Sequence, residues 1–483
     1  MQVACPGCGI ETLLQTEAPA DSEPSQAITA AELQAAFAGP VARRRIGIFY
    51  QVGLLLVAVF MVLLPVVYFA FAALAGYGVY WYAVHGWVIF TSFAGGLYVM
   101  VLKMILYIGP LLGGTTAVFF MFKPILARSP KGATSLELNP AQHPRLYQFI
   151  AHVSDLLQVG MPKRIYLDGE LDASAGLRRG GLSFLSKDLV LNLGLPLVAG
   201  LNTRHFAALV AHELGHCTQW LALRLGYIIR RVNAWFARVV YERDTWDEAL
   251  GEWSNSVEDW RLSLVVVCVN LAVWLSRRVL FLLMVAGHAI SCFLSRQMEY
   301  HADACSIAVA GSEAVESLLL RLREQSLVEG TAYGALRQIW QKGHKLPDNL
   351  PDFLDKLEKG LPSNFYENAR LTLLNETAGL WATHPTAAQR IQRARRRGEP
   401  GVFRMEKPAR ALFGDFGATA RAVSARHYRQ NLKLAVTDAM LKPVSDFFQQ
   451  PAPVSSEEPV QLEPVAGQGQ RLRLRRTSGT AES

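Results

Sequence analysis

Residues 46 to 102 contain no aspartate, glutamate, lysine or arginine, and this run constrains the fold more than any other feature of the chain. At a rise of about 1.5 Å per residue, Gly47 to Ala75 is long enough to cross a hydrocarbon layer of about 30 Å as one helix. The aromatic residues within Tyr77 to Trp87 are typical of a membrane interface. A second apolar block, Val88 to Phe122, is too long for one upright helix and is expected to form a span plus an interfacial or re-entrant piece. We therefore predict an integral membrane protein.

Basic residues lie at the outer ends of these two blocks. Arg43 to Arg45 precede the first block, and Lys123, Arg128 and Lys131 follow the second, whereas the connection between the blocks has no charged residue. Because cytoplasmic loops are enriched in lysine and arginine, both ends are predicted to lie in the cytoplasm. A second block that crossed twice would place the rest of the chain outside, and the basic residues after it argue against that alternative. The expected location is the inner (cytoplasmic) membrane, multi-pass, with the following domain in the cytoplasm.

A short pattern in the more polar part of the chain predicts a metal site. His212 to His216 reads H-E-x-x-H and lies in an apolar run that Asn202 or Thr203 can cap as a helix. Residues four apart lie on one face of a helix, so both histidines can bind one Zn²⁺ while Glu213 stands beside the metal. This arrangement suits the activation of a water molecule for peptide hydrolysis.

The third ligand is predicted further along the chain. Glu299 and Asp303 are four residues apart, so on a helix one carboxylate can bind the metal and the other can accept a ring N–H from a ligand histidine. His301 would project to the opposite side, which favours Glu299 as the ligand. Two apolar segments, residues 262–275 and 279–294, precede this helix. A shallow hairpin, one bent span and a buried helical pair are open alternatives for them.

Three motifs follow one another in this part of the chain: His212-Glu213-Leu214-Gly215-His216, then Ser295-Arg296 with Glu299-Tyr300 and Ala302-Asp303, then Thr383-His384-Pro385 with Arg390-Ile391. Together they resemble the M48 family of membrane metallopeptidases, the HtpX and Ste24 group. The resemblance covers roughly residues 140 to 395, and the two leading transmembrane segments also match the HtpX-like layout. It implies a mainly α-helical gluzincin-type zinc metallopeptidase domain with a small β-sheet, in which two histidines and a glutamate hold one Zn²⁺ per catalytic site.

The expected chemistry is hydrolysis of a peptide bond. Three protein ligands leave an open position for a water molecule, whose pKa Zn²⁺ lowers toward neutrality. Glu213 is expected to take a proton from this water and to deliver it to the leaving amine. His384 and Arg390 are candidates to stabilise the developing oxyanion. Alternatives for His384 are that it covers the fourth metal position at rest, or that its turn simply caps the following helix.

A strand edge near the metal helix is a candidate substrate-binding site. Asp172-Ala173-Ser174-Ala175 lies between two predicted strands, residues 164–167 and 189–193. An exposed edge can pair with an extended peptide backbone. The family's substrate strand, usually Asn-Ala-Phe-Ala, corresponds best to these four residues, with departures at two positions. A plain surface hairpin is the alternative.

Both ends of the chain lie outside the resemblance. Cys5 and Cys8 form a C-P-G-C turn that resembles one knuckle of a zinc ribbon, a candidate second metal site that a second chain would complete by self-association. A plain flexible terminus is the alternative. The predicted organisation is an N-terminal cytosolic segment (1–40), a transmembrane region of about two spans (41–125), a peptidase domain (126–400) with an apolar helical insertion (262–294), a helical extension (401–450) and a disordered tail (451–483).

The predicted function is a membrane-anchored zinc endopeptidase that hydrolyses membrane or membrane-proximal proteins, with protein quality control or processing as its role. The net charge of +8 is concentrated beside apolar segments and in residues 387–397, so the lipid bilayer is the expected partner; nucleic acid is not, because no reading module is evident. The alternative function is a non-proteolytic membrane scaffold or adaptor with a structural zinc site. Glu213 argues against this alternative, because a purely structural site does not need a base.

Overall fold

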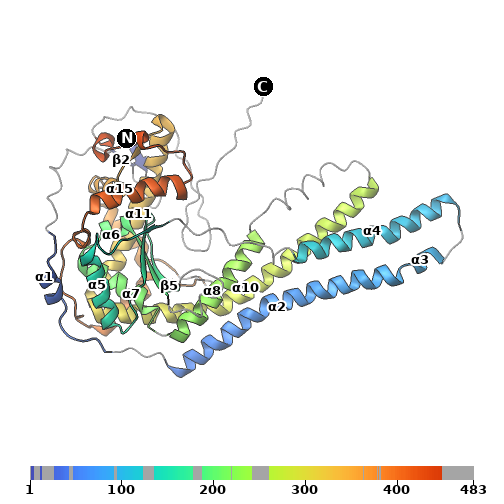
Figure 1. The fold of residues 1–483 in the computed structure, drawn as a ribbon, viewed down its shortest axis with the longest axis horizontal. Helices are drawn as coiled ribbons and strands as arrows, with labels where there is room; N and C mark the ends of the chain where they lie inside the picture. The colour runs from blue at the N-terminus through green and yellow to red at the C-terminus, as the bar shows by residue number, and fades with distance from the viewer. Residues whose placement is uncertain are drawn as a thin grey trace. The chain divides into compact units, whose positions relative to one another are not determined.

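The structure, a computed structural model, consists of two compact units (Figure 1). The apolar unit comprises Gly47–Lys131 and Arg224–Leu294, and the α/β unit comprises Met1–Ile46, Gly132–Leu223 and Ser295–Ser483. The residues described are 2–4, 11–13, 27–42, 47–91, 95–122, 135–177, 188–218, 220–241, 260–362, 364–377, 379 and 382–448. Cys5, Cys8 and the tail 451–483 lie outside them, so the predictions for these residues stay predictions.

Helices form the apolar unit. They are α2 (Ile48–His85), α3 (Val88–Thr91), α4 (Leu97–Phe122), most of α8 (Trp220–Tyr241) and the first part of α10 (Trp260–Ala310), and all but α3 are long. Helices α2 and α4 pack side by side: the Tyr82 hydroxyl donates to the Leu106 carbonyl at 2.6 Å, and the Tyr107 hydroxyl donates to that of Ala83 at 2.7 Å. Gly76 lies beside Val118 and Val79 beside Gly114, so the two helices run in opposite directions and the pair is antiparallel.

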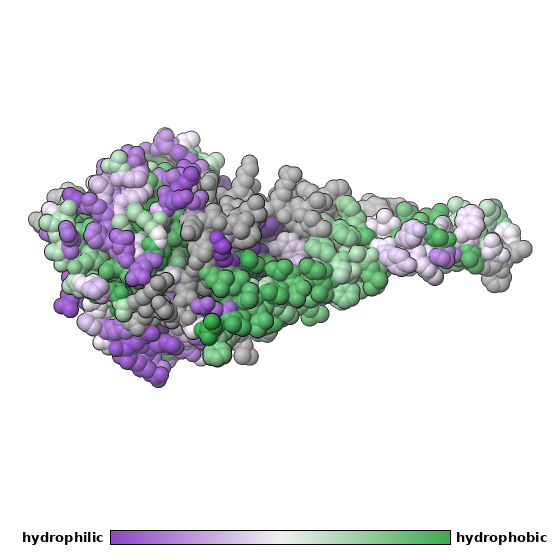
Figure 2. All heavy atoms as spheres, turned by 60° about the horizontal axis from the view of Figure 1, so that its bottom comes forward, coloured by the Kyte–Doolittle hydropathy of each residue, from purple (hydrophilic) through white to green (hydrophobic). Residues whose placement is uncertain are grey.

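The outer surface of this unit is apolar. Many large hydrophobic side chains on α2 and α4 are exposed, such as Phe49 at 91%, and apolar residues gather over these helices in Figure 2. Three helical stretches in the described part of the chain are long and apolar enough to cross a membrane: Ile48–Thr91, Leu97–Phe122 and Val273–Ala310. The second apolar block of the sequence thus forms the short helix α3 and the long helix α4. The two apolar segments at 262–275 and 279–294 form one uninterrupted helix, α10, rather than a hairpin or a pair.

A small sheet lies at the centre of the α/β unit. Its strand order is β3 (Leu136–Glu137), β4 (Arg164–Asp168), β6 (Leu189–Gly194) and β5 (Ala173–Leu177). Strand β6 is parallel to β4 and antiparallel to β5, with Ala175 opposite Leu191. Strands β4 and β6 match the two predicted strands, and β5 contains most of the predicted substrate segment. Among the described residues, β5 pairs with β6 alone, which makes it an edge strand of this sheet.

Helices surround the sheet and carry the site. They are α1 (Ala30–Ala35), α5 (Pro144–Leu156), α6 (Leu195–Ala199), α7 (Thr203–Gly215), the last part of α10, α11 (Ser312–Gly343), α12 (Leu350–Lys359), α13 (Asn364–Leu374), α14 (Ala387–Arg397) and α15 (Phe416–Arg426). Aromatic rings fill the core between α5 and α7, where Phe149 stacks on Phe206 with ring centroids 5.3 Å apart. Short elements complete the unit: β1 (Gln2–Ala4), β2 (Glu11–Leu13), β7 (Leu346–Pro347), β8 (Leu441–Lys442), η2 (Ala409–Leu412), η3 (His427–Asn431), η4 (Asp438–Met440) and η5 (Val444–Phe447).

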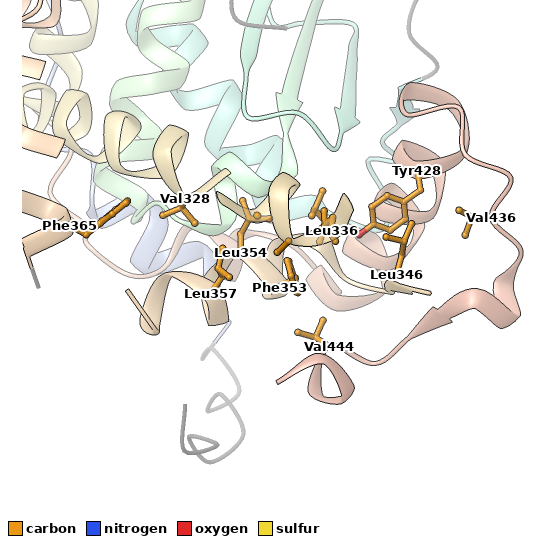
Figure 3. Packing of buried hydrophobic residues seen from close by; sticks show 13 residues of the cluster. Val328, Leu336, Leu346, Phe353, Leu354, Leu357, Phe365, Tyr428, Val436 and Val444 are labelled. Carbon is orange, nitrogen blue, oxygen red and sulfur yellow. The ribbon is translucent and has the colours of Figure 1, made fainter. Parts of the chain in front are cut away.

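The C-terminal extension is part of this packing. A second apolar cluster joins α11, α12 and α13 to residues 428–444, with Tyr428 and Phe353 fully buried in it (Figure 3). The described part of the extension, residues 401–448, contains one α-helix, α15, whereas its other helical turns are short 3₁₀ or π segments. Residues 428–444 therefore belong to the core of the α/β unit.

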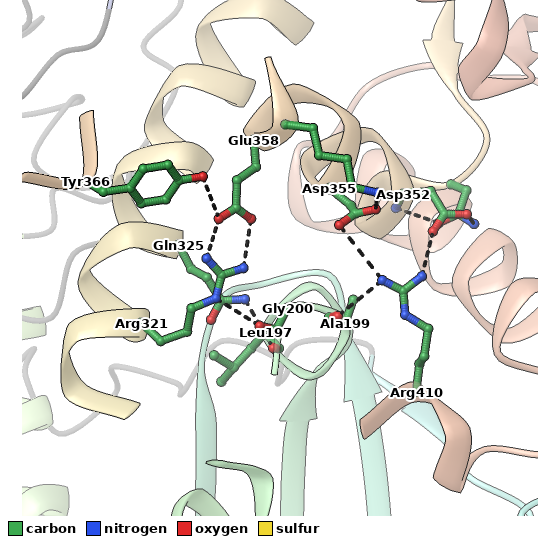
Figure 4. Close-up of polar contacts among 12 residues, drawn as sticks. Leu197, Ala199, Gly200, Arg321, Gln325, Asp352, Asp355, Glu358, Tyr366 and Arg410 are labelled. Carbon is green, nitrogen blue, oxygen red and sulfur yellow. Dashed lines mark hydrogen bonds and ion pairs between the residues drawn. The ribbon is translucent and has the colours of Figure 1, made fainter. Parts of the chain in front are cut away.

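Polar side chains hold the end of α6, immediately before α7. Arg321 donates to the Gly200 carbonyl at 2.9 Å and forms an ion pair with Glu358 (Figure 4). Gln325 donates to the Leu197 carbonyl at 3.3 Å and Arg410 to that of Ala199 at 3.5 Å. Cationic and amide donors at a helix C-terminus satisfy carbonyls that have no partner within the helix. This network anchors the short connection that leads into α7.

Candidate metal centre

Helix α7 begins where the sequence predicts. The side-chain oxygen of Asn202 accepts from the His205 backbone N–H at 2.7 Å and thereby caps the first turn. Apolar residues then bury nearly all of the helix, including Phe206 and Leu214 at 0% exposure. His212 and His216 are one turn apart at its C-terminal end, with their ring planes nearly perpendicular and the ring centroids 4.9 Å apart.

Glu299 on α10 completes a group that can hold a metal. Ligand atoms of His212, His216 and Glu299 all lie within 4.8 Å of one another. His212 Nε2 is 3.4 Å from Glu299 Oε2, and His216 Nε2 is 3.6 Å from Glu299 Oε1. Tetrahedral Zn²⁺ with ligands at about 2.1 Å needs ligand atoms about 3.4 Å apart. The three donors and their spacing therefore fit zinc.

The two helices meet in an antiparallel register. Along α7, residues 208, 212 and 216 face residues 306, 303 and 299 of α10: the Ser306 hydroxyl donates to the Ala208 carbonyl at 2.7 Å, and His212 Nδ1 is 3.1 Å from Asp303 Oδ1. On the neighbouring face, His301 Nε2 is 2.9 Å from the Thr218 hydroxyl, away from the ligands. The four-residue spacing in each motif thus places both on one helix–helix contact.

Asp303 and Arg390 lie behind His212. Asp303 is 3% exposed, and its bond to Nδ1 leaves Nε2 of His212 free to face Glu299. Arg390 holds Asp303 with both ends of its guanidinium, Nε to Oδ2 at 2.9 Å and Nη2 to Oδ1 at 2.6 Å. This engagement places Arg390 behind the ligand sphere, a different position from the oxyanion contact that the sequence suggested.

His384 lies on the open side of the group. Its Nδ1 is 3.2 Å from Glu299 Oε1, and its side chain is 68% exposed. The hydrogen bond to Glu299 raises the pKa of His384 above its ordinary value. Helix α14 is capped by Thr386 and Gln389 in a reciprocal pair of bonds, so it needs no cap from His384.

Glu213 lies between the metal group and strand β5. Its carboxylate accepts the Ala175 backbone N–H at 3.2 Å, and burial raises its pKa to about 7. The other residues of the predicted substrate segment lie at the start of β5, where Asp172 caps the Ala173 N–H and Ser174 accepts from Asn192. Helix and edge strand therefore meet at Glu213.

Some residues of the site escaped the sequence patterns. Ser306 and Arg204, which tie α7 to α10, and Arg321, which holds the end of α6, have no motif of their own. The groups that they hold on α6, α7 and α10 are backbone carbonyls, which every residue has. Only the four-residue spacing of Arg204, Ala208 and His212 hints at a shared face.

A metallopeptidase needs metal ligands, a base beside them and a place for an extended peptide. The α/β unit brings residues suited to each task to one place, and the described part of the chain has three stretches of membrane-spanning character. Together these features define the class of protein as a membrane-anchored metallopeptidase. The particular family follows from comparison: residues 140–398, more than half of the chain, match the model of Peptidase family M48, and the chain belongs to this family.

Curated relatives agree with this assignment. Protease HtpX of Acinetobacter baumannii (strain AYE) is 24% identical over 308 residues, which cover 62% of this chain and 86% of that protein. Protease HtpX of Acinetobacter baylyi (strain ATCC 33305 / BD413 / ADP1) is 24% identical over 310 residues with the same coverage. The predictions of the family, of the fold class and of a membrane-anchored protease are thereby confirmed, and nothing favours the scaffold alternative.

One solved structure is also similar. The crystal structure of S. mikatae Ste24p is 17% identical, with a TM-score of 0.27, and the match covers 70% of this chain and 67% of that one. A TM-score of this size carries no argument about the fold, so the assignment rests on the sequence matches.

Proposed function

We propose that the protein is a zinc-dependent endopeptidase in which His212, His216 and Glu299 bind the metal. The observation that supports this most is the convergence of these three ligands within 4.8 Å beside the carboxylate of Glu213. A zinc ion held there would act as a Lewis acid on the scissile carbonyl and lower the pKa of a water molecule. Asp303 would fix the tautomer and orientation of His212, with Arg390 holding Asp303 in place.

Glu213 is the proposed general base and acid. Its position beside the ligands lets it accept a proton from the attacking water and transfer it to the leaving amine nitrogen. His384, exposed beside Glu299, is a proposed donor to the oxyanion that develops at the carbonyl. The alternative that it occupies the fourth metal position at rest predicts that His384→Ala activates the enzyme instead of weakening it.

Strand β5 is the proposed binding edge for the substrate. Asp172 to Ala175 lie at or beside an edge strand whose Ala175 N–H already faces Glu213. Pairing with this edge recognises extended backbone more than particular side chains. Such recognition suits unfolded segments of membrane or membrane-proximal proteins, and we therefore propose protein quality control as the role.

We propose the cytoplasmic membrane as the location, with the α/β unit in the cytoplasm. The basic residues that flank the two apolar blocks support this orientation. Residues 27–42, which precede the first candidate span, pack within the α/β unit, where the Ala38 N–H donates to the Val402 carbonyl at 2.7 Å. Groups on opposite sides of a membrane cannot form such a bond, so an even number of crossings must separate residue 42 from residue 135. The two candidate spans in this part of the chain satisfy that requirement.

A second metal site is a separate proposal. Cys5 and Cys8 lie outside the described residues, and a C-P-G-C turn supplies only half of a tetrahedral thiolate site. We propose that a second chain supplies the other half, so that metal binding there would accompany self-association.

Replacement of Glu213 tests the proposed function. In purified full-length protein in detergent, Glu213→Gln should reduce cleavage of an unfolded protein by about 10²–10⁴-fold, because the base is lost while the shape is kept. Zinc content, measured by elemental analysis, should stay at the wild-type value. Glu316→Gln is the matched control, since Glu316 pairs with Arg395 at the surface and should leave cleavage unchanged. Equal cleavage by wild type and Glu213→Gln would remove the hydrolytic assignment to this site.

A further inference from the structure

The contact between α7 and α10 continues beyond the metal ligands. Arg204, Ala208, His212 and His216 form one stripe of α7 at four-residue intervals, and they face residues 310, 306, 303 and 299 of α10. In this stripe His212 and His216 are the proposed metal ligands, whereas Arg204 and Ala208 form hydrogen bonds that join the helices directly. The relative placement of the ligands therefore depends on how this stripe is held in register.

Arg204 joins the first turn of α7 to the last turn of α10. Its Nε donates to the Ala310 carbonyl at 3.0 Å, and its Nη1 is 3.0 Å from Glu406 Oε1. The Ala310 carbonyl is at the C-terminal end of α10, where it has no partner within the helix and where a cation is favoured. The side chain is only 19% exposed, so water replaces this bond poorly if it is lost.

A single extended segment, residues 399–409, holds the same two helix ends, and we call it the strap. On α10, the Val309 carbonyl accepts the N–H groups of Val402 and Phe403 at 2.8 and 2.9 Å. On α7, the Thr203 N–H donates to the Lys407 carbonyl and the Thr203 hydroxyl to that of Met405, both at 2.7 Å. The strap begins directly after the part of the chain that matches the family model, residues 140–398.

Backbone packing leaves little freedom at this junction. Gly311 and Gly401 both have positive φ, and a Cβ on Gly401 would lie 2.3 Å from the Gly311 nitrogen. Ser306, 1% exposed, adds a second buried tie through the Ala208 carbonyl. The ends of α7 and α10 are thus bound to each other directly and through the strap.

We propose that Arg204, together with the strap, is a positioning residue that sets the register of α7 against α10 and thereby brings Glu299 to the two ligand histidines. This inference rests on the proposed zinc site. A slip of α7 along α10 by one turn would move the ligand histidines by about 5.4 Å, which exceeds the separation of the ligand atoms. A shift by only part of a turn would therefore already disrupt the metal site. Arg204 touches neither metal nor substrate and acts only through this register.

Substitution of Arg204 tests the inference in full-length protein in detergent. Arg204→Ala should weaken zinc binding by about 10–100-fold in competition with a chelator, as changes behind metal ligands do. It should also alter the visible absorption of the Co²⁺-substituted protein and lower kcat with little change in KM. Arg204→Lys, which can still place a cation between Glu406 and the Ala310 carbonyl, should recover part of the affinity. Arg395→Ala, which removes an exposed ion pair with Glu316, is the control and should change none of these.

A second variant guards against general unfolding. Glu406→Gln keeps the bond from Arg204 to Ala310, so it should fold and weaken zinc binding by less than Arg204→Ala. Wild-type zinc affinity and Co²⁺ absorption in Arg204→Ala would overturn the inference and leave the proposed function intact. If Arg204→Ala fails to fold, wild-type zinc affinity in both Glu406→Gln and Arg204→Lys would likewise overturn it. Absence of zinc binding by the wild-type protein would instead overturn the proposed function.

Discussion

Gly215 decides how closely α7 can approach α10. A Cβ at this position would lie 3.0 Å from Ala302 Cα and 3.1 Å from Cys305 Cβ. Backbone and Cβ atoms cannot rotate away, so an added methyl group must move one helix. Alanine is better than glycine inside a helix by about 0.5–1 kcal/mol, whereas overpacking of a tight contact costs about 1–3 kcal/mol. The packing cost is the larger effect, and it arises at a position between His212 and His216.

Gly215→Ala should therefore destabilise the protein despite its better helix propensity. We expect a lower midpoint of thermal unfolding and weaker zinc binding, because the wider helix separation draws Glu299 away from the histidines. Gly334→Ala is the matched control: Gly334 lies in α11 with nothing within 4 Å of an added Cβ, so alanine should stabilise by about 0.5–1 kcal/mol. Thermal unfolding in detergent measures both, and a shift in the same direction would contradict the packing argument.

At the scale of elements, the N-terminal segment, residues 27–42, packs against the strap. Phe37 and Phe403 form an antiparallel bridge, and their rings lie 4.7 Å apart. Phe403 also contacts Phe149, which stacks on Phe206 of α7. An aromatic chain thus leads from the segment before the first candidate span to the helix that carries the metal-binding histidines.

Phe37→Ala should destabilise the α/β unit. Truncation of a fully buried phenylalanine to alanine lowers the free energy of unfolding by about 3–5 kcal/mol. Because Phe37 is half-buried, its truncation should cost about 2 kcal/mol. We expect the midpoint of thermal unfolding to fall and the chain near residue 40 to become more sensitive to added protease. Phe49→Ala, on the exposed surface of α2, should change neither. Equal behaviour of the two variants would mean that the N-terminal segment does not stabilise the unit.

For the whole molecule, the contact between residues 27–42 and the α/β unit restricts the membrane topology. On the proposed topology, in which the candidate spans Ile48–Thr91 and Leu97–Phe122 both cross, these parts lie on one side and the connection between the two spans lies on the other. The same reasoning applies between Leu223 and Ser295, which both belong to the α/β unit, so this part of the chain also crosses an even number of times or not at all.

Cysteine labelling in intact cells tests this topology. In a background without the six native cysteines, Gly96→Cys should react with a membrane-impermeant maleimide, whereas Ala31→Cys and Lys345→Cys should react only after lysis. All three positions are exposed, so protection from the reagent reports the membrane and not burial. Different labelling of Ala31→Cys and Lys345→Cys would contradict the contact between the two ends of the chain. Labelling of both, with Gly96→Cys protected, would invert the orientation.

The sequence by itself determined the features that depend on local spacing. The uncharged run at 46–102 predicts membrane-spanning helices because their length and composition suffice, and H-E-x-x-H predicts two histidines on one helix face because the period of a helix is known. Glu299 was predicted for the same reason, from its four-residue distance to Asp303. The sequence also predicts both strands that flank the substrate segment.

Tertiary structure alone decided how these local pieces meet. It joined residues 262–294 into one continuous helix, placed Arg390 behind Asp303, and made residues 399–409 a strap across the ends of α7 and α10. Each of these depends on contacts between residues far apart in the chain, and many of the partners are backbone groups that carry no sequence signal. Local periodicity specifies which face of a helix a residue occupies, but the register between two helices is set by all of their contacts together.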